Sequence, residues 1–248
     1  MLHPTLASPL SLSISKYCAT FTDLTWYTFS MNEKEIIEAT VEYVQTTLAG
    51  AEGGHDWWHI YRVWNNAKLI ASGEANIDML TIELGSLLHD IADSKFHAGD
   101  EEIGPRTARS FLESLKVDIS VIEHVENIVR HISFKGSLEG QSWTSSELAV
   151  VQDADRLDAI GAIGIARTFN YGGHVGREIF NPTIPPNLHM TKEEYKKTTA
   201  PTLNHFYEKL LLLKDMMNTA TGKQIAQARH EYMENFLEQF HAEWNGQK

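Results

Sequence analysis

The sequence predicts an all-α protein built as a single helical bundle. Apolar residues recur every three or four positions through successive segments, which is the spacing of helices that face a core. No stretch shows the sustained apolar and polar alternation of a half-buried strand, and no internal repeat is visible. With 248 residues, 42% of them hydrophobic, the chain can bury one substantial core, and domains of this size commonly remain undivided.

The first 30 residues differ from the rest of the chain. They are rich in Ser and Thr, contain two prolines, and lack the basic stretch followed by a long apolar run of a secretory signal. Met31 begins a sequence that could start a protein in its own right. We therefore expect residues 1–30 to be a disordered leader or the product of a reading frame that starts too early. Residues 31–248 are expected to form the folded domain.

The next part of the chain predicts five helices, separated by glycines and turn residues. The expected ranges are 33–48, 56–72, 77–93, 104–115 and 120–131. The first of them shows the pattern clearly, with apolar side chains at Ile36, Ile37, Val41, Val44 and Leu48.

A sixth helix is expected to open at residues 145–147, to run through Asp155 towards residue 166, and to be broken by the glycines at 172–173. Residues 172–202 contain four prolines and are expected to form loops. Helical periodicity then returns over residues 203–213 and 225–240.

Composition limits the possible partners. The net charge of −12 argues against a broad nucleic-acid surface, because affinity for the phosphate backbone depends on clustered Lys and Arg. An anionic substrate must therefore meet positive charge locally. The single cysteine, Cys18, fits a reducing, cytoplasmic setting. No window reaches the ~18 apolar residues expected of a membrane span, so no membrane partner is expected.

Four side chains suggest a metal site: His59, His89, Asp90 and Asp155. Two imidazoles and two carboxylates form a mixed nitrogen and oxygen ligand set that suits a divalent cation. A cation with open coordination positions can activate water at neutral pH, so these residues predict a hydrolase. We expect one divalent ion, manganese first, with cobalt, nickel, iron, zinc and magnesium as alternatives.

Three ordered segments around these residues resemble the HD superfamily of metal-dependent phosphohydrolases. They are residues 54–63 (Gly-His-Asp-Trp-Trp-His-Ile-Tyr-Arg-Val), 87–93 (Leu-Leu-His-Asp-Ile-Ala-Asp) and 153–161 (Asp-Ala-Asp-Arg-Leu-Asp-Ala-Ile-Gly). The resemblance implies an all-α HD domain in which His59 is the first ligand. It also selects Asp155 among three neighbouring carboxylates. Asp158 is expected to orient a ligand or to pair with Arg156, whereas Asp153 could be a surface charge.

The resemblance extends to the substrate and to a catalytic residue. The pattern His-Asp-Trp-x-His and the C-terminal helical extension resemble a subgroup that acts on nucleotides, which implies a small phosphorylated substrate. A nucleoside triphosphate cleaved to monophosphate and pyrophosphate is one such reaction. In related proteins an acidic residue three positions after the His-Asp pair acts in catalysis, and Asp93 matches it. We expect Asp93 to be the general base or acid, although a solvated aspartate at a helix end also fits.

Four further residues are candidates for binding the substrate. Arg62 lies one helical turn from His59, and Lys95 follows Asp93 by two positions. His131 could contact a phosphate or protonate the leaving group, and Lys135 lies close to it in sequence. Lys95 could equally be a surface lysine, and His131 a core or surface histidine.

Two other classes of function remain open. A dinuclear-iron HD oxygenase would use the same four ligands together with extra histidines. A regulator that binds nucleotides without turnover would retain affinity but release no phosphate. A homodimer is compatible with either of these and with a hydrolase.

Overall fold

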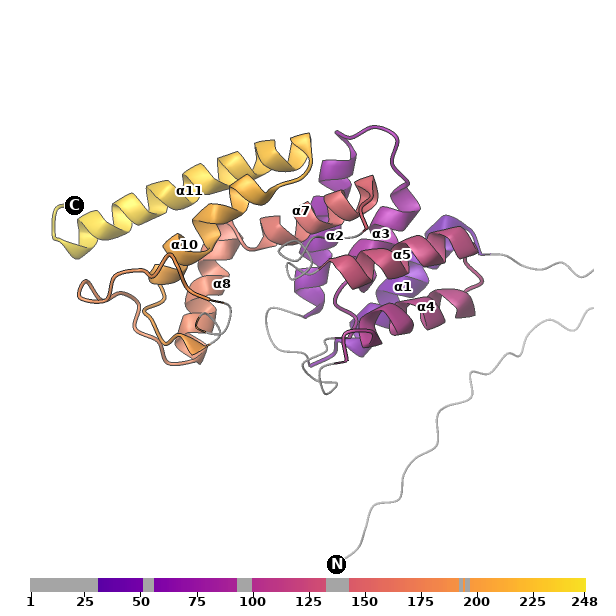
Figure 1. The fold of residues 1–248 in the computed structure, drawn as a ribbon, viewed down its shortest axis with the longest axis horizontal. Helices are drawn as coiled ribbons and strands as arrows, with labels where there is room; N and C mark the ends of the chain where they lie inside the picture. Colours follow the sequence, from indigo (N-terminus) through magenta and orange to yellow (C-terminus); the bar gives the residue numbers. More distant parts are fainter. Residues whose placement is uncertain (1–30, 51–55, 93–99, 133–142, 192–193, 195–196) are drawn as a thin grey trace, which may run out of the picture. The chain divides into compact units, whose positions relative to one another are not determined.

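The computed structural model describes residues 31–50, 56–92, 100–132, 143–191, 194 and 197–248, and all regular secondary structure in these ranges is helical. The all-α prediction is therefore confirmed. Residues 1–30 lie outside the described residues, as does the expectation of a leader. The elements, shown in Figure 1, are α1 (Glu33–Thr47), α2 (Trp57–Ala71), α3 (Met79–Leu88), α4 (Ile103–Ser114), α5 (Ile119–His131), α7 (Ser146–Asp158), α8 (Gly161–His174), α10 (Asn204–Glu208), the 3₁₀ helix η2 (Leu210–Met216) and α11 (Ala220–Trp244).

Polar residues fix where several helices begin. Asn32 forms a capping box with Glu35 at the start of α1, because each side chain bonds to the other residue's backbone N–H. Asp56 caps α2 by accepting a hydrogen bond from the backbone N–H of His59 at 2.9 Å. Ser145 caps α7 in the same way. These caps satisfy N–H groups that the helix leaves without partners.

Two apolar clusters hold the bundle together, and α2 contributes to both. Ile60 on α2 packs with Leu84 and Leu88 of α3 in a cluster that also contains α1, α4 and α5. Val63, one turn further along α2, belongs to a second cluster with residues of α7, α10, η2 and α11, including Phe206. The helices that carry the candidate ligands, α2, α3 and α7, are thereby fixed between well-packed regions.

The expected sixth helix is two helices, so that prediction was wrong in its boundaries. The chain breaks after Asp158 and restarts at Gly161, whose φ of +74° is rare for residues other than glycine. A Cβ at Gly161 would also lie 3.0 Å from Cγ of Arg229. Helix α8 then continues through the glycines at 172–173, where a break was expected, and ends at His174. The break lets α8 leave in a new direction, so that residues of α8 can fold back on α7.

Other boundaries differ less. Helix α3 ends at Leu88 with His89 as its C-cap, earlier than expected, and α11 is longer than residues 225–240. None of the helices in the described part of the chain is both long enough and apolar enough to cross a membrane.

Candidate metal centre

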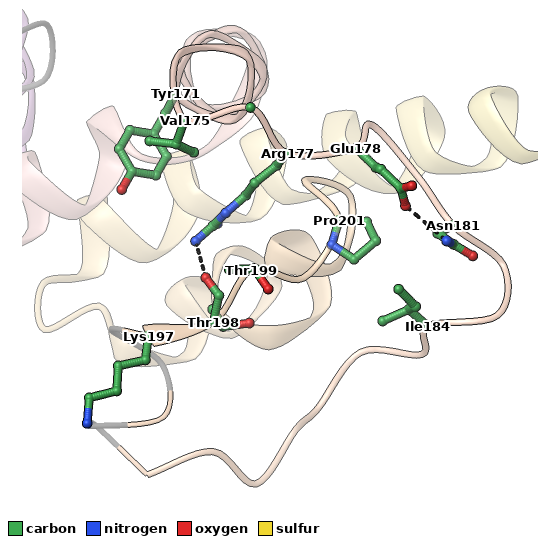
Figure 2. A pocket seen from close by; sticks show the side chains of 11 residues that line it. Tyr171, Val175, Arg177, Glu178, Asn181, Ile184, Lys197, Thr198, Thr199 and Pro201 are labelled. Atoms are coloured by element: carbon green, nitrogen blue, oxygen red, sulfur yellow. Dashed lines mark hydrogen bonds between the residues drawn. The ribbon is translucent and has the colours of Figure 1, made fainter.

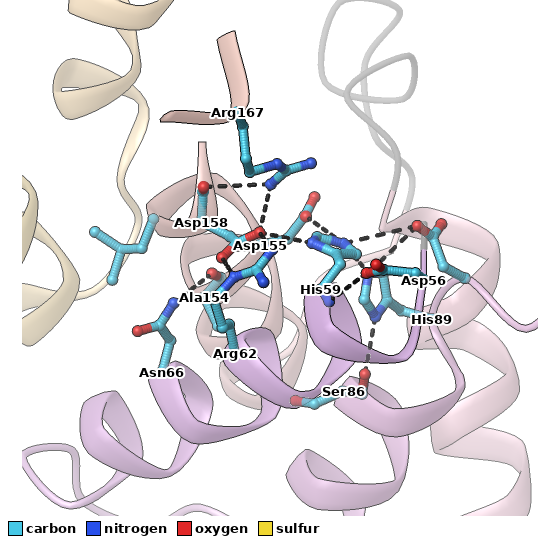
Figure 3. Close-up of polar contacts among 12 residues, drawn as sticks. Asp56, His59, Arg62, Asn66, Ser86, His89, Ala154, Asp155, Asp158 and Arg167 are labelled. Atoms are coloured by element: carbon cyan, nitrogen blue, oxygen red, sulfur yellow. Dashed lines mark hydrogen bonds and ion pairs between the residues drawn. The ribbon is translucent and has the colours of Figure 1, made fainter. Parts of the chain in front are cut away.

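The four predicted ligands lie together although they come from three helical regions. The Nε2 atoms of His59 and His89 are 3.3 Å apart. Oδ1 of Asp155 lies 3.5 Å from Nε2 of His59. Oδ2 of Asp90 lies 3.7 Å from Nε2 of His59 and 3.8 Å from Nε2 of His89. Figure 3 shows His59, His89 and Asp155 pointing toward a common space.

Local structure explains these positions. The cap at Asp56 starts α2 so that His59 falls in its first turn. His89 is the last residue of the turn that ends α3, and Asp90 follows it where the helix has stopped. Asp155 lies in the last turn of α7. The ends of three packed helices therefore meet at the candidate site.

The hydrogen bonds of the two imidazoles test whether a cation fits there. Nδ1 of His59 lies 2.8 Å from Oδ2 of Asp158, and Nδ1 of His89 lies 2.8 Å from the carbonyl oxygen of Ser86. Because a carboxylate and a carbonyl only accept hydrogen bonds, Nδ1 carries the hydrogen in both rings. In the neutral form of each ring, Nε2 then presents a lone pair to the other imidazole and to the two carboxylates. A cluster of electron-pair donors of this kind fits a cation, and metal-binding histidines commonly have such partners on the other nitrogen.

The site is closed on one side and open on the other. The imidazole side chains of His59 and His89 are 4% and 2% exposed, whereas those of Asp90 and Asp155 are 25% and 41% exposed. Catalytic metal sites keep a position open to water or substrate. The carboxylate side is therefore the side from which a substrate could approach.

Asp158 orients His59, which is the first of the two roles expected for it. It is buried, and its oxygens accept hydrogen bonds from Nδ1 of His59, from Nε and Nη2 of Arg62 at 2.5 and 3.0 Å, and from Nη1 of Arg167. Burial opposes ionisation, but the hydrogen bonds from His59 and Arg62 and the charge of Arg167 outweigh it and hold the pKa of Asp158 well below the usual aspartate value. Arg156 pairs instead with Asp153.

The predicted substrate-binding residues have different surroundings. Two nitrogens of Arg62 bond to Asp158, so its contacts are those of a residue that positions the ligand helix. Nδ1 of His131 donates to the carbonyl oxygen of Asn127, and its ring packs against the ring of Trp143. Asp93, Lys95 and Lys135 lie outside the described residues.

Several residues that bear on the site were not predicted from the sequence. Arg167 reaches Asp158 because α8 turns back at Gly161, and no local pattern signals this return. Lys209 lies near enough to Asp155 for the carboxylate charge to act on its pKa. Arg229 of α11 donates to the carbonyl of Leu157 and so braces the end of α7.

Asp153, for which a surface charge was one interpretation, is fully buried. Its carboxylate accepts hydrogen bonds from the backbone N–H groups of Asn218 and Thr219, which precede α11. The start of α11 therefore needs an acceptor inside the protein, and Asp153 supplies it. This role depends on packing between distant segments, so the sequence around Asp153 carried no sign of it.

Comparisons with known proteins agree with this geometry. The HD domain family model matches residues 57–160, which include all four candidate ligands. The uncharacterized protein YpgQ of Bacillus subtilis is 34% identical over 218 residues, which are 84% of this chain and 94% of YpgQ. An HD-superfamily hydrolase of Bacillus thuringiensis is 44% identical, with a TM-score of 0.69 over 86% of this chain and 99% of that structure.

A crystal structure of Bacillus subtilis YpgQ in complex with ADP is 33% identical, with a TM-score of 0.63 over 86% of this chain and 97% of that structure. The family model, the close relatives that this chain covers almost completely and the shared helical fold all point the same way. This chain belongs to the HD superfamily of metal-dependent phosphohydrolases.

Proposed function

We propose that this phosphohydrolase acts on nucleotides, cleaving a nucleoside triphosphate to the monophosphate and pyrophosphate. We also propose that His59, His89, Asp90 and Asp155 hold one divalent ion, with manganese as the first candidate. The observation that carries the proposal is the close approach of two imidazole nitrogens and two carboxylates at the ends of α2, α3 and α7. When bound, the cation would polarise a phosphoryl oxygen and lower the pKa of water.

The chain's own residues would divide the remaining work. Asp158 keeps the His59 imidazole in one orientation and in the tautomer that offers Nε2 as a ligand atom. Ser86 does the same for His89 through its carbonyl oxygen. Asp90 and Asp155 face the more open side, where an incoming phosphate would lie. Asp93 stays our candidate for the group that takes a proton from the attacking water.

A relative supports nucleotides as the substrate class. YpgQ of Bacillus subtilis has been crystallised with ADP, and it aligns with most of this chain at 33% identity. ADP presents both a nucleoside and a phosphate chain. A triphosphate adds one phosphate to the same framework, and its cleavage between the α and β phosphates gives the proposed products.

One experiment tests both the reaction and the site. The full chain is stripped of metal, reconstituted with each divalent cation in turn, and screened against nucleotides and simple phosphoesters, with orthophosphate and pyrophosphate measured separately. We expect the greatest turnover with manganese and release of pyrophosphate from a nucleoside triphosphate. Asp93→Asn and Asp155→Ala should abolish turnover, and full activity in both variants would show that the assigned site is wrong.

The alternatives give different results in the same screen. An HD oxygenase would need two iron ions and would consume oxygen. A regulator would bind nucleotide and release no product with any metal. Among the described residues, one group of three or more potential ligands has its donor atoms within 4.8 Å of one another, namely His59, His89 and Asp155, which supports a single ion. A homodimer remains a prediction, testable by sedimentation.

A further inference from the structure

Lysine, arginine and histidine side chains follow one another from the candidate metal centre into the C-terminal part of the chain. Lys209 lies at the junction of α10 and η2, near Asp155 of the metal centre and near Arg167. Burial of its ammonium group lowers the pKa of Lys209, the charge of Asp155 acts to raise it, and the charge of Arg167 acts to lower it further. Lys209 therefore lies near Arg167 and beside the more exposed of the two carboxylate ligands.

Helix α10 continues this series away from the metal centre. His205 precedes Lys209 by one turn, and the backbone N–H of Lys209 bonds to the carbonyl of His205. His205 lies close enough to Lys209 and Arg177 for both charges to act on it. Arg177 is held near the residues that lead into α10, because the backbone N–H groups of Thr202 and Leu203 donate to the carbonyl oxygens of Glu178 and Ile179.

Arg177 lines a cavity of about 530 Å³. Its lining includes Tyr171 at the end of α8, Asn181, and Thr199. Figure 2 shows Arg177 between Tyr171 and Thr198, with its Nη2 donating to the Thr198 carbonyl at 2.6 Å. The Tyr171 side chain is largely exposed, and the Arg177 guanidinium lies 5.7 Å from the centre of its ring. A cavity of this size, with an accessible aromatic ring and several polar groups, suits a small organic ligand.

We propose that the substrate lies along this series, with its phosphate chain beside Lys209 and Arg177 and its nucleoside in the cavity at Tyr171. This inference rests on the proposed nucleotide substrate and assigns the residues that recognise it. Lysine and arginine supply the charge that phosphates need in a chain with a net charge of −12. Tyr171 offers a face on which a base can stack. Arg177 lines the cavity, and the charge interactions of His205 and Lys209 continue the series to Asp155.

Binding of two probes to the full chain tests the inference without turnover. Calorimetry in the presence of a chelator compares ADP, which has a nucleoside, with inorganic pyrophosphate, which has none. Lys209→Gln should weaken both about tenfold or more, because it removes a charge-assisted contact. Tyr171→Ala should weaken ADP by about tenfold, the lower part of the range for base stacking, and leave pyrophosphate unchanged.

The control is Lys34→Gln, which makes the same charge change at a highly exposed lysine on α1. It should bind both probes like the unmodified protein, and thermal unfolding should show that all three variants are folded. Unchanged binding of both probes by Lys209→Gln would overturn the inference, as would an equal loss of both probes in Tyr171→Ala. If these losses occur but no metal supports nucleotide cleavage, the proposed reaction fails and the binding inference stands.

Discussion

Replacing Asp158 with asparagine should weaken metal binding without removing any metal ligand. The carboxylate receives four N–H donors on two oxygens, from His59, Arg62 and Arg167. Asparagine keeps only one acceptor oxygen. If that oxygen remains facing His59, the amide NH₂ group faces the Arg62 guanidinium, and the bond to His59 loses its charge assistance.

The size of the effect follows from these contacts. Hydrogen bonds to charged groups contribute about 1.5–3 kcal/mol and neutral ones about 0.5–1.5 kcal/mol, so the bond to His59 weakens by about 1–1.5 kcal/mol. If that loss is passed to the metal, affinity falls by about tenfold, the lower end of the range for such partners. The Arg62 and Arg167 side chains are 30% and 33% exposed. Water can therefore solvate both guanidinium groups. Removing one partner of a buried ion pair costs about 3–5 kcal/mol, and the loss of folding stability here should fall at or below the lower end of that range.

Calorimetric titration of metal-stripped protein with Mn²⁺ measures this effect. The matched control is Asp153→Asn, which changes another buried carboxylate on α7 that bonds to Asn218 and Thr219 rather than to a ligand. The control should lose folding stability and keep its metal affinity. Unchanged Mn²⁺ affinity in folded Asp158→Asn, or an equal loss in the control, would refute the reasoning.

Three other predictions concern stability. Because the folded-state pKa of Asp158 is depressed, its contribution to folding stability should be complete above the ordinary aspartate pKa of about 3.9 and be lost as the pH falls below that value. In denaturant unfolding, the stability of Asp158→Asn should therefore depend less on pH in acid than that of the unmodified protein. Burial, with the charges of Lys209 and Arg177, lowers the pKa of His205 to about 4. Because the unfolded chain then binds more protons between about pH 6.5 and 4, folding stability should fall as the pH drops through that interval. His205→Gln should remove this component of the pH dependence, and an unchanged profile would contradict the prediction. Gly164→Ala should destabilise the protein strongly in thermal unfolding, because its Cβ would lie 2.2 Å from the carbonyl oxygen of Ala159. On the same helix, a Cβ at Gly173 would meet nothing within 4 Å, so Gly173→Ala should be neutral or stabilising by up to about 1 kcal/mol. Similar effects of the two substitutions would contradict the observed junction of α7 and α8.

Local patterns were sufficient to predict most of the helices, and the resemblance of three short segments to the HD superfamily selected the candidate ligands. The apolar spacing predicted residues 33–48 as a helix, and α1 spans Glu33–Thr47. The His-Asp pair and the segment around Asp155 could be recognised because each lies within a short stretch of chain. The structure then brings them together with His59, as the proposed site requires.

The remaining features depend on packing between distant segments. Gly161 begins α8 just after the break that ends α7. In the sequence, however, a single glycine inside a periodic segment resembles many that helices tolerate. Arg167 and Lys209 approach Asp158 and Asp155 only after that turn is made. The burial of Asp153 could not be predicted for the same reason, since its partners lie 65 and 66 positions away.

Manganese-soaked crystals of the full chain test the central claim most directly. Anomalous diffraction should place a single manganese ion between Nε2 of His59 and Nε2 of His89, in contact with the carboxylates of Asp90 and Asp155, and the peak should vanish in Asp155→Ala. A fully occupied ion bound elsewhere, with these four side chains making no contact to it, would contradict the account.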